Sequence, residues 1–120
     1  MAAGNEALKT RLARDREITL TVTGRKSGRA ISIPVWFVLE GNKLYLLPVQ
    51  GSDTQWYKNV LTNPTIRIEA QGAGAELHVV PITDGARVSP VAEKFRAKYG
   101  ARDVTKYYSK LDVAVLAQMG

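Results

Sequence analysis

Residues 17–40 read EITLTVTGRKSGRAISIPVWFVLE, two strand-like runs on either side of a basic, glycine-flanked turn. In the first run Ile18, Leu20 and Val22 alternate with polar residues, the pattern of a β-strand with one face in water. The second run, 30–39, also alternates, and both of its faces become apolar toward its end, which indicates burial on both sides there. These residues predict an antiparallel hairpin on which the rest of the chain is organised.

The turn at residues 23–29 concentrates three cations, two hydroxyls and two glycines. Glycines take positive φ without a Cβ penalty, so successive backbone N–H groups could converge on one anion as they do in phosphate-binding loops. Arg25 and Lys26 would add charge, and Ser27 would add a hydroxyl donor. A tight hairpin turn with solvated charges has the same composition, so both interpretations stand at this point.

Length and composition predict one domain over residues 1–120, with an N-terminal helical segment at 1–15 and a barrel at 17–119. The absence of cysteine excludes disulfides and thiol chemistry. A single histidine, His78, leaves no cluster for zinc or iron, and we expect no metal site. No apolar run is long enough for a bilayer and no signal-peptide pattern is present, so the expected location is the cytoplasm.

The net charge of +6 favours an anionic partner, which could be nucleic acid, an anionic lipid surface or a phosphorylated small molecule. Aromatic residues fall mostly at apolar positions rather than on exposed stacking surfaces, so we expect no nucleic-acid partner. A short helix predicted from Glu6 to about Arg14 presents a basic face. That face is either simply solvated or able to associate weakly with a membrane surface.

Further elements follow from local signals. Ser52 and Gln55 match a capping box that opens a helix ending near Leu61, and Ser89 before Pro90 indicates the start of another helix, which Gly100 closes. A last short helix is expected at 103–109. The remaining strands are expected at 43–49, 65–70, 76–82 and 111–119, with a glycine-rich turn at 71–75.

These elements predict a six-stranded antiparallel sheet that forms a small barrel, closed by the C-terminal strand and with helices over its openings. The sequence argues against a parallel dinucleotide-binding sheet, because the β-α-β rhythm and the G-x-G-x-x-G fingerprint are both missing.

Two motifs, TVTGRKSG at 21–28 and WYKNVLTNP at 56–64, resemble the deazaflavin-dependent nitroreductase family. That family belongs to the flavin/deazaflavin oxidoreductases with an FMN-binding split β-barrel. The similarity runs from about Glu17 to the C-terminus and is strongest over 21–68. It implies a mainly β (α+β) fold, a six-stranded antiparallel split β-barrel with short helices over its openings.

The resemblance also implies a site for coenzyme F420, a hydride carrier with a phosphate and an acidic tail; FMN is the alternative cofactor. Arg25, Lys26 and Ser27 match the phosphate turn of the family, and Tyr107 or Tyr108 matches a tyrosine that faces the substrate, so both are catalytic candidates. Further cofactor-binding positions carried over by the motifs are Pro34, Val35, Leu47, Pro48, Val49, Gln50, Trp56, Tyr57 and Asn59. Without the resemblance, Trp56 and Tyr57 would be interpreted as core residues.

The function that this implies is an F420-dependent oxidoreductase that passes a hydride to a small quinone, enone or nitro compound. The alternatives are an FMN-dependent enzyme of the same fold and a non-catalytic flavin or deazaflavin carrier. Val49 replaces a serine found in many relatives, and the loop 51–56 is shorter than usual, so nitroreduction in particular is the less supported reaction. Split barrels often pair across the sheet, so a homodimer is compatible with this interpretation.

Overall fold

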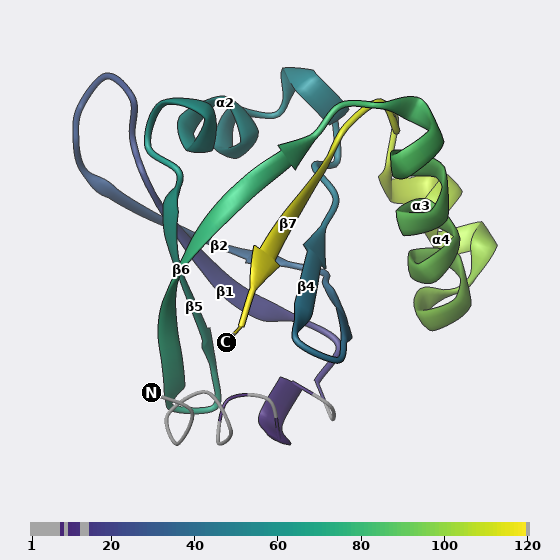
Figure 1. Ribbon diagram of the computed structural model, residues 1–120, viewed down its shortest axis with the longest axis horizontal. Helices are drawn as coiled ribbons and strands as arrows, with labels where there is room; N and C mark the ends of the chain where they lie inside the picture. Colours follow the sequence, from purple (N-terminus) through teal and green to yellow (C-terminus); the bar gives the residue numbers. More distant parts are fainter. Residues whose placement is uncertain (1–7, 9, 13–14, 120) are drawn as a thin grey trace.

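Figure 1 shows the computed structural model, which describes residues 8, 10–12 and 15–119. Within this part of the chain, seven antiparallel strands form a curled sheet in the order β2-β1-β5-β6-β7-β4-β3. The strands are β1 (Ile18–Thr23), β2 (Ala30–Val35), β3 (Val38–Glu40), β4 (Lys43–Leu46), β5 (Thr65–Ala70), β6 (Ala73–Ile82) and β7 (Ala114–Gln118). The helical elements are η1 (Gly51–Asp53), α2 (Gln55–Thr62), α3 (Gly85–Tyr99) and α4 (Ala101–Tyr107).

The predicted fold class, a mainly antiparallel split barrel, is confirmed. The alternation of apolar and polar residues along the strands also predicts correctly which face of the sheet is buried. Ile18, Leu20 and Val22 point into the core of the barrel, and Leu20 pairs in register with Ile68 of β5. On β5 the alternation is complete, with Ile66 and Ile68 buried between exposed neighbours.

The predicted single strand at 30–39 is wrong, and its division is why the sheet has seven strands instead of six. The ladder of β2 stops at Val35, and β3 starts at Val38 on the opposite edge of the sheet. Phe37 between them is fully buried, and its backbone bonds the hydroxyl of Tyr99 rather than a neighbouring strand. This corner therefore carries the chain from one sheet edge to the other. It also leaves β2 an exposed edge strand, where the missing N–H of Pro34 is tolerated.

The predicted capping box is also wrong. Thr54 occupies the N-cap of α2, and the hydroxyl of Ser52 instead donates to Asp112 at 2.6 Å, which holds Ser52 in the 3₁₀ turn η1. The strand predicted at 43–49 is β4, and it ends at Leu46, because the backbone after it leaves the ladder and bonds the loop after α4.

Other boundaries shift for local reasons. Asp84 caps α3 through the amide of Ala86 at 3.0 Å, so this helix begins before the predicted Ser89 and Pro90 lies inside it. The turn between β5 and β6 contains only Gln71 and Gly72, both at positive φ (51° and 84°), as in a two-residue hairpin, rather than the five residues expected. The last helix and the last strand are bounded by 101–107 and 114–118 instead of 103–109 and 111–119.

Among the residues that the structure describes, two apolar clusters hold the fold together. One fills the barrel and includes Leu8 and Leu12, which are 0% and 2% exposed; the rest of the predicted N-terminal helix, at 6, 7, 9, 13 and 14, lies outside the described residues. The other cluster lies under α3 and α4, which pack together beside β4 and β7 (Figure 1). None of the helices in the described residues is long and apolar enough to span a membrane.

Candidate functional site

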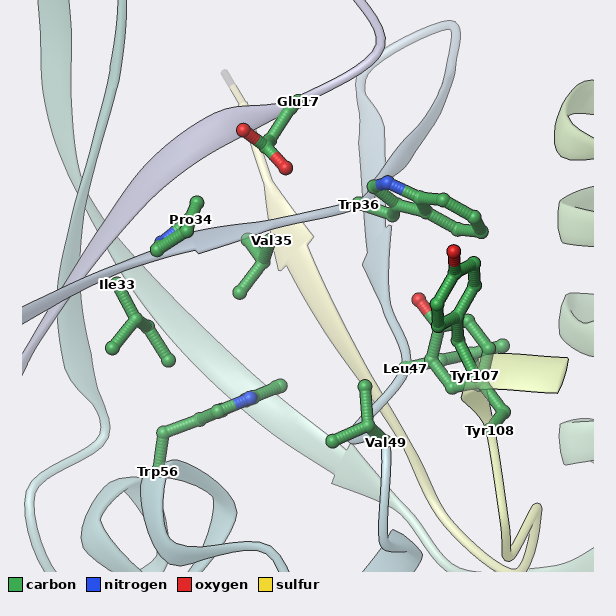
Figure 2. Close-up of a pocket in the computed structure, with 10 residues that line it drawn as sticks. All are labelled: Glu17, Ile33, Pro34, Val35, Trp36, Leu47, Val49, Trp56, Tyr107 and Tyr108. Carbon is green, nitrogen blue, oxygen red and sulfur yellow. The ribbon is translucent and has the colours of Figure 1, made fainter. Parts of the chain in front are cut away.

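A hollow of about 430 Å³ lies at the corner where the chain leaves β2, and we call it the corner pocket (Figure 2). Its volume falls within the range of about 300–1,000 Å³ that is usual for small-molecule sites. It is walled by β2, the strand end after β4, α2 and α4. The lining residues are Glu17, Ile33, Pro34, Val35, Trp36, Leu47, Val49, Trp56, Tyr107 and Tyr108.

The structure brings one part of the predicted site together in this pocket and leaves the other part outside it. The predicted residues that line it are Pro34, Val35, Leu47, Val49, Trp56, Tyr107 and Tyr108. Those that do not are Arg25, Lys26, Ser27, Pro48, Gln50, Tyr57 and Asn59. Sequence reasoning missed three lining residues: Ile33, Trp36 and Glu17. Ile33 shares the inward phase of Val35 and could have been found from it, whereas no sequence signal marks Glu17.

The aromatic wall of the corner pocket is built around Trp36. Its indole stacks on Tyr99 with centroids 4.2 Å apart and an interplanar angle of 5°. Tyr107 meets the indole edge-on at 5.6 Å and 81°, and Tyr108 lies at 6.0 Å and 54°. Contacts of this kind hold aromatic rings in defined orientations, so the wall is preformed.

Tyr99 anchors this wall at the corner. Its hydroxyl lies 2.7 Å from the carbonyl oxygen of Arg16 and 2.8 Å from that of Phe37, and it accepts the Phe37 N–H at 3.1 Å. Burial raises the pKa of Tyr99 to about 12, so the donor proton is retained at neutral pH. Lys98 donates to the same Phe37 carbonyl at 2.9 Å, and burial, with help from the nearby charge of Arg16, lowers the pKa of Lys98 to about 8.

The two tyrosines of the pocket differ in exposure. Tyr107 is 52% exposed and Tyr108 only 6%. Figure 2 shows both hydroxyls on the side that faces Trp36. Burial, with a smaller contribution from Tyr99, raises the pKa of Tyr108, so its hydroxyl remains a proton-bearing donor across the neutral range.

The basic turn satisfies many of its own amides. The Gly24 N–H donates to the Arg29 carbonyl at 2.8 Å and the Gly28 N–H to the Gly24 carbonyl at 2.9 Å, while the Arg29 N–H donates to the Ser27 hydroxyl at 3.2 Å. The expected convergence of free N–H groups on an anion is therefore not the arrangement seen. The side chains of Lys26 and Arg29 have no hydrogen-bond or ion-pair partner among the described residues, so they are the cations that the turn presents to solvent.

Arg25 ties the turn to the pocket through α2. Its backbone N–H and its Nη1 both donate to Oδ1 of Asn59, at 3.1 and 2.7 Å, and its Nη2 donates to Oε1 of Gln55 at 2.9 Å. Asn59 is 5% exposed, so this acceptor is largely shielded from water. Trp56, which lines the pocket, lies on the same helix between these two partners. The two sequence motifs are thus parts of one structural unit.

The strand end at 47–50 is clamped from both sides. The carbonyl of Val49 accepts the Ser109 amide at 2.9 Å and its hydroxyl at 3.2 Å, and the amide of Gln50 donates to the Thr54 hydroxyl at 2.8 Å. Tyr57 is buried in the barrel core, and this burial, together with the nearby charge of Asp112, raises its pKa.

An antiparallel sheet of this order, curled so that β2 and β3 form the two open edges, defines a split-barrel protein. The family described as "Uncharacterized protein conserved in bacteria (DUF2255)" matches residues 9–115, and the chain belongs to this family.

Solved structures with the same fold include an F420-H2 dependent reductase and proteins that store or bind heme. One is the F420-H2 dependent reductase FDR-A, 20% identical, with a TM-score of 0.66 over 86% of this chain and 94% of that one. Another is the heme storage protein HutZ from Vibrio cholerae, 13% identical, with a TM-score of 0.70 over 94% and 87% of the two chains. A heme binding protein from Mycobacterium smegmatis is 16% identical, with a TM-score of 0.66 over 96% of this chain and 50% of that one. At these identities the likeness shows the fold alone.

Proposed function

We propose that this protein binds a phosphate-bearing flavin-type cofactor, coenzyme F420 with FMN as the alternative, and passes a hydride to a small activated acceptor such as a quinone, enone or nitro compound. The observation that carries the proposal is the link between an apolar, aromatic-walled pocket and a basic turn, both attached to α2. When bound, such a cofactor supplies the hydride chemistry, while the protein supplies orientation and exclusion of water.

The apolar residues would receive a flat ring. Pro34 and Val35 offer one wall, Leu47 and Val49 another, and Trp56 a third. Burial of a large ring against such surfaces contributes about 25 cal/mol of favourable free energy for each Å² of apolar area removed from water. The clamped strand end at 47–50 keeps these walls in place.

The cofactor phosphate would be held by the basic turn. Lys26 and Arg29 are exposed and unpaired among the described residues, and Arg suits phosphate because its fork bonds two oxygens at once. Arg25 would act mainly by bracing α2, since Asn59 and Gln55 already occupy its donors. The hydroxyl of Ser27 has a lone pair engaged by Arg29 N–H and can still donate its proton.

The tyrosine hydroxyls would serve the acceptor. A quinone, enone or nitro oxygen gains negative charge when hydride arrives, and an O–H donor stabilises that charge. Tyr108 is held in its protonated form by burial, and Tyr107 is open to a ligand from outside. Either hydroxyl could donate a hydrogen bond to the acceptor.

The test is a titration of the purified protein with F420 and, separately, with FMN, at low and moderate salt. The chain has two tryptophans and both line the corner pocket, so quenching of intrinsic fluorescence reports on this site. We expect a Lys26→Ala, Arg29→Ala double variant to weaken binding at least tenfold, with a reduced salt dependence. Lys43→Ala, an exposed cation on the β3–β4 hairpin, is the matched control and should bind like the wild type.

The outcomes separate the alternatives. F420 binding followed by acceptor-dependent oxidation of the reduced cofactor supports the proposed enzyme, and the same behaviour with FMN moves the chemistry to the flavin branch. Binding of neither cofactor refutes the proposal.

A second candidate is a carrier that binds a flat amphipathic ring without catalysis, heme included. The exposed hydroxyl of Tyr107 at the pocket favours it, because tyrosinate can serve as an axial iron ligand. The chain's one histidine, His78, is on the exposed outer face of β6 and away from this pocket. A heme titration that gives a Soret band lost in Tyr107→Phe, with no turnover of F420 or FMN, would support this candidate over the enzyme.

A further inference from the structure

The corner pocket has one charged wall residue. Of the described residues that line it, Glu17 alone carries a formal charge, and the others are apolar or aromatic. Figure 2 shows the carboxylate of Glu17 directed from the start of β1 toward the space beside Pro34 and Val35. A ligand in the pocket would therefore meet a single negative group on an otherwise uncharged surface.

The carboxylate of Glu17 acts on the nearby Tyr99 hydroxyl through its charge. Among the described residues, no hydrogen-bond donor or cation pairs with Glu17. The adjacent Arg16 instead places its guanidinium over the ring of Tyr99, 5.1 Å from the centroid. Glu17 is thus available to a ligand.

The surroundings increase the negative potential at this mouth of the pocket. Glu17 also lines a shallow groove on the other side of Pro34, to which Asp15 and Glu69 contribute their carboxylates. Asp15 accepts from Gln71, and Glu69 has only a long ion pair of 3.8 Å with Arg67. Arg16 also lines this groove, so three carboxylates face one guanidinium there, and the local excess is negative although the whole chain carries a net charge of +6.

The aromatic walls match the same kind of ligand. Trp36, Trp56 and Tyr107 surround the cavity, and aromatic faces attract a positive charge, with Trp the most effective. A carboxylate together with aromatic rings is the combination that favours organic cations over neutral rings of the same shape.

We propose that the corner pocket selects a flat aromatic cation, a heteroaromatic ring with a positively charged ring nitrogen, and that Glu17 pairs with this charge while Trp36 and Tyr107 pack on the ring. This inference concerns binding of the cation to the corner pocket and does not rest on the proposed hydride transfer.

The experiment compares 1-methylquinolinium with quinoline at pH 8, where quinoline is neutral and of almost the same shape. Each compound is titrated into the protein without added cofactor by isothermal calorimetry, with tryptophan quenching as a second readout. We expect the wild type to bind the cation about fivefold to tenfold more tightly than quinoline. Both compounds stack on the aromatic rings, but only the cation also forms a partly exposed charge pair with Glu17. This preference should shrink as salt is raised.

Charge variants assign the effect to Glu17. Glu17→Gln should remove most of the preference by weakening only the cation, and Glu17→Lys should reverse it. Glu76→Gln, an exposed carboxylate on β6 that does not line the pocket, is the control and should keep the wild-type preference. Thermal unfolding of each variant confirms that the fold is intact.

Three results would overturn the inference: equal or tighter binding of quinoline to the wild type, equal weakening of both compounds by Glu17→Gln, and no binding of either compound. The F420 titration is independent of this test. If the protein binds the cation but no cofactor, the inference about Glu17 stands and the proposed function is refuted. If it binds a cofactor but shows no preference for the cation, the proposed function stands and the inference about Glu17 is refuted.

Discussion

Replacement of Asn59 by alanine should separate the basic turn from α2. In the structure one buried oxygen of Asn59 accepts two bonds from Arg25, one from the backbone N–H at 3.1 Å and one from Nη1 at 2.7 Å. Alanine removes the acceptor, which leaves the backbone N–H of Arg25 without this partner and leaves Nη1 with only its long bond of 3.4 Å to the Gln55 carbonyl. The turn and the helix that carries Trp56 would then lose their main connection.

The magnitude follows from the two bonds. A neutral hydrogen bond contributes about 0.5–1.5 kcal/mol net and one from a charged donor about 1.5–3 kcal/mol. Partial exposure of Arg25 lets water replace some of this, so we expect Asn59→Ala to lower the free energy of unfolding by about 3 kcal/mol. For a chain of this length such a loss corresponds to a fall in Tm of roughly 10 °C.

The assay is urea unfolding followed by tryptophan fluorescence and circular dichroism. Asn59→Asp keeps an acceptor and adds charge assistance from Arg25, so it should stay within about 1 kcal/mol of the wild type. Gln55→Ala is the matched control on the same helix; it removes only the exposed bond from Nη2 and should change stability by about 0.5 kcal/mol. A double-mutant cycle of Arg25→Ala with Asn59→Ala should give a coupling energy of about 1.5–3 kcal/mol.

A loss below about 1 kcal/mol for Asn59→Ala, or one no larger than that of Gln55→Ala, would refute this reasoning. It would mean that the turn is held by its own backbone bonds and that its attachment to α2 is incidental.

Three further predictions concern pH and backbone strain. The pKa of Lys98, lowered to about 8, lies below that of an unfolded lysine, so the unfolded state binds more protons than the folded state between pH 8 and about 10. The free energy of unfolding should therefore rise over this window, and it should rise less in Lys98→Met. Urea unfolding at each pH measures both. The pKa of Tyr108 is raised above the ordinary 10, so its contribution to stability is present below pH 10 and lost above it; Tyr108→Phe should show a shallower loss in the same measurement. Gly51 has φ 55°, and a Cβ added there would lie too close to Asp112; Gly41 has φ 61° but open space around it. Gly51→Ala should therefore lower the free energy of unfolding by at least about 2 kcal/mol more than Gly41→Ala does.

The site was predictable in its apolar part more than in its charged part. The resemblance named Val35 and Trp56 as site residues, and both side chains line the pocket. The local pattern by itself indicates only an inward phase for Val35 and a core position for Trp56. The interpretation of Arg25 as a free phosphate ligand did not foresee Asn59 as its acceptor, because these residues are separated by 34 positions. Glu17 was missed because a charged residue at a strand start is usually solvated, and only the corner of the chain beside it creates a pocket there.

The sequence by itself determined the barrel's inner surface. Alternation along β1 and β5 reflects local geometry, in which the backbone alone decides which side chains share a face. The helical spacing of Val91, Phe95 and Tyr99 likewise determined the face of α3 that packs in the second cluster. These faces are buried as the pattern indicated, and positive φ at Gly100 ends α3 where expected.

Only the tertiary structure decided where the sheet divides and where the pocket forms. The apolar run at 30–39 is compatible with a continuous strand, and it breaks at Phe37 because the hydroxyl of Tyr99, 62 positions away, satisfies the backbone there. The same tyrosine stacks on Trp36, and Trp36 and Glu17 both line the cavity at this corner. Local patterns cannot encode such a choice, because its free energy comes from groups that meet only after the chain has folded.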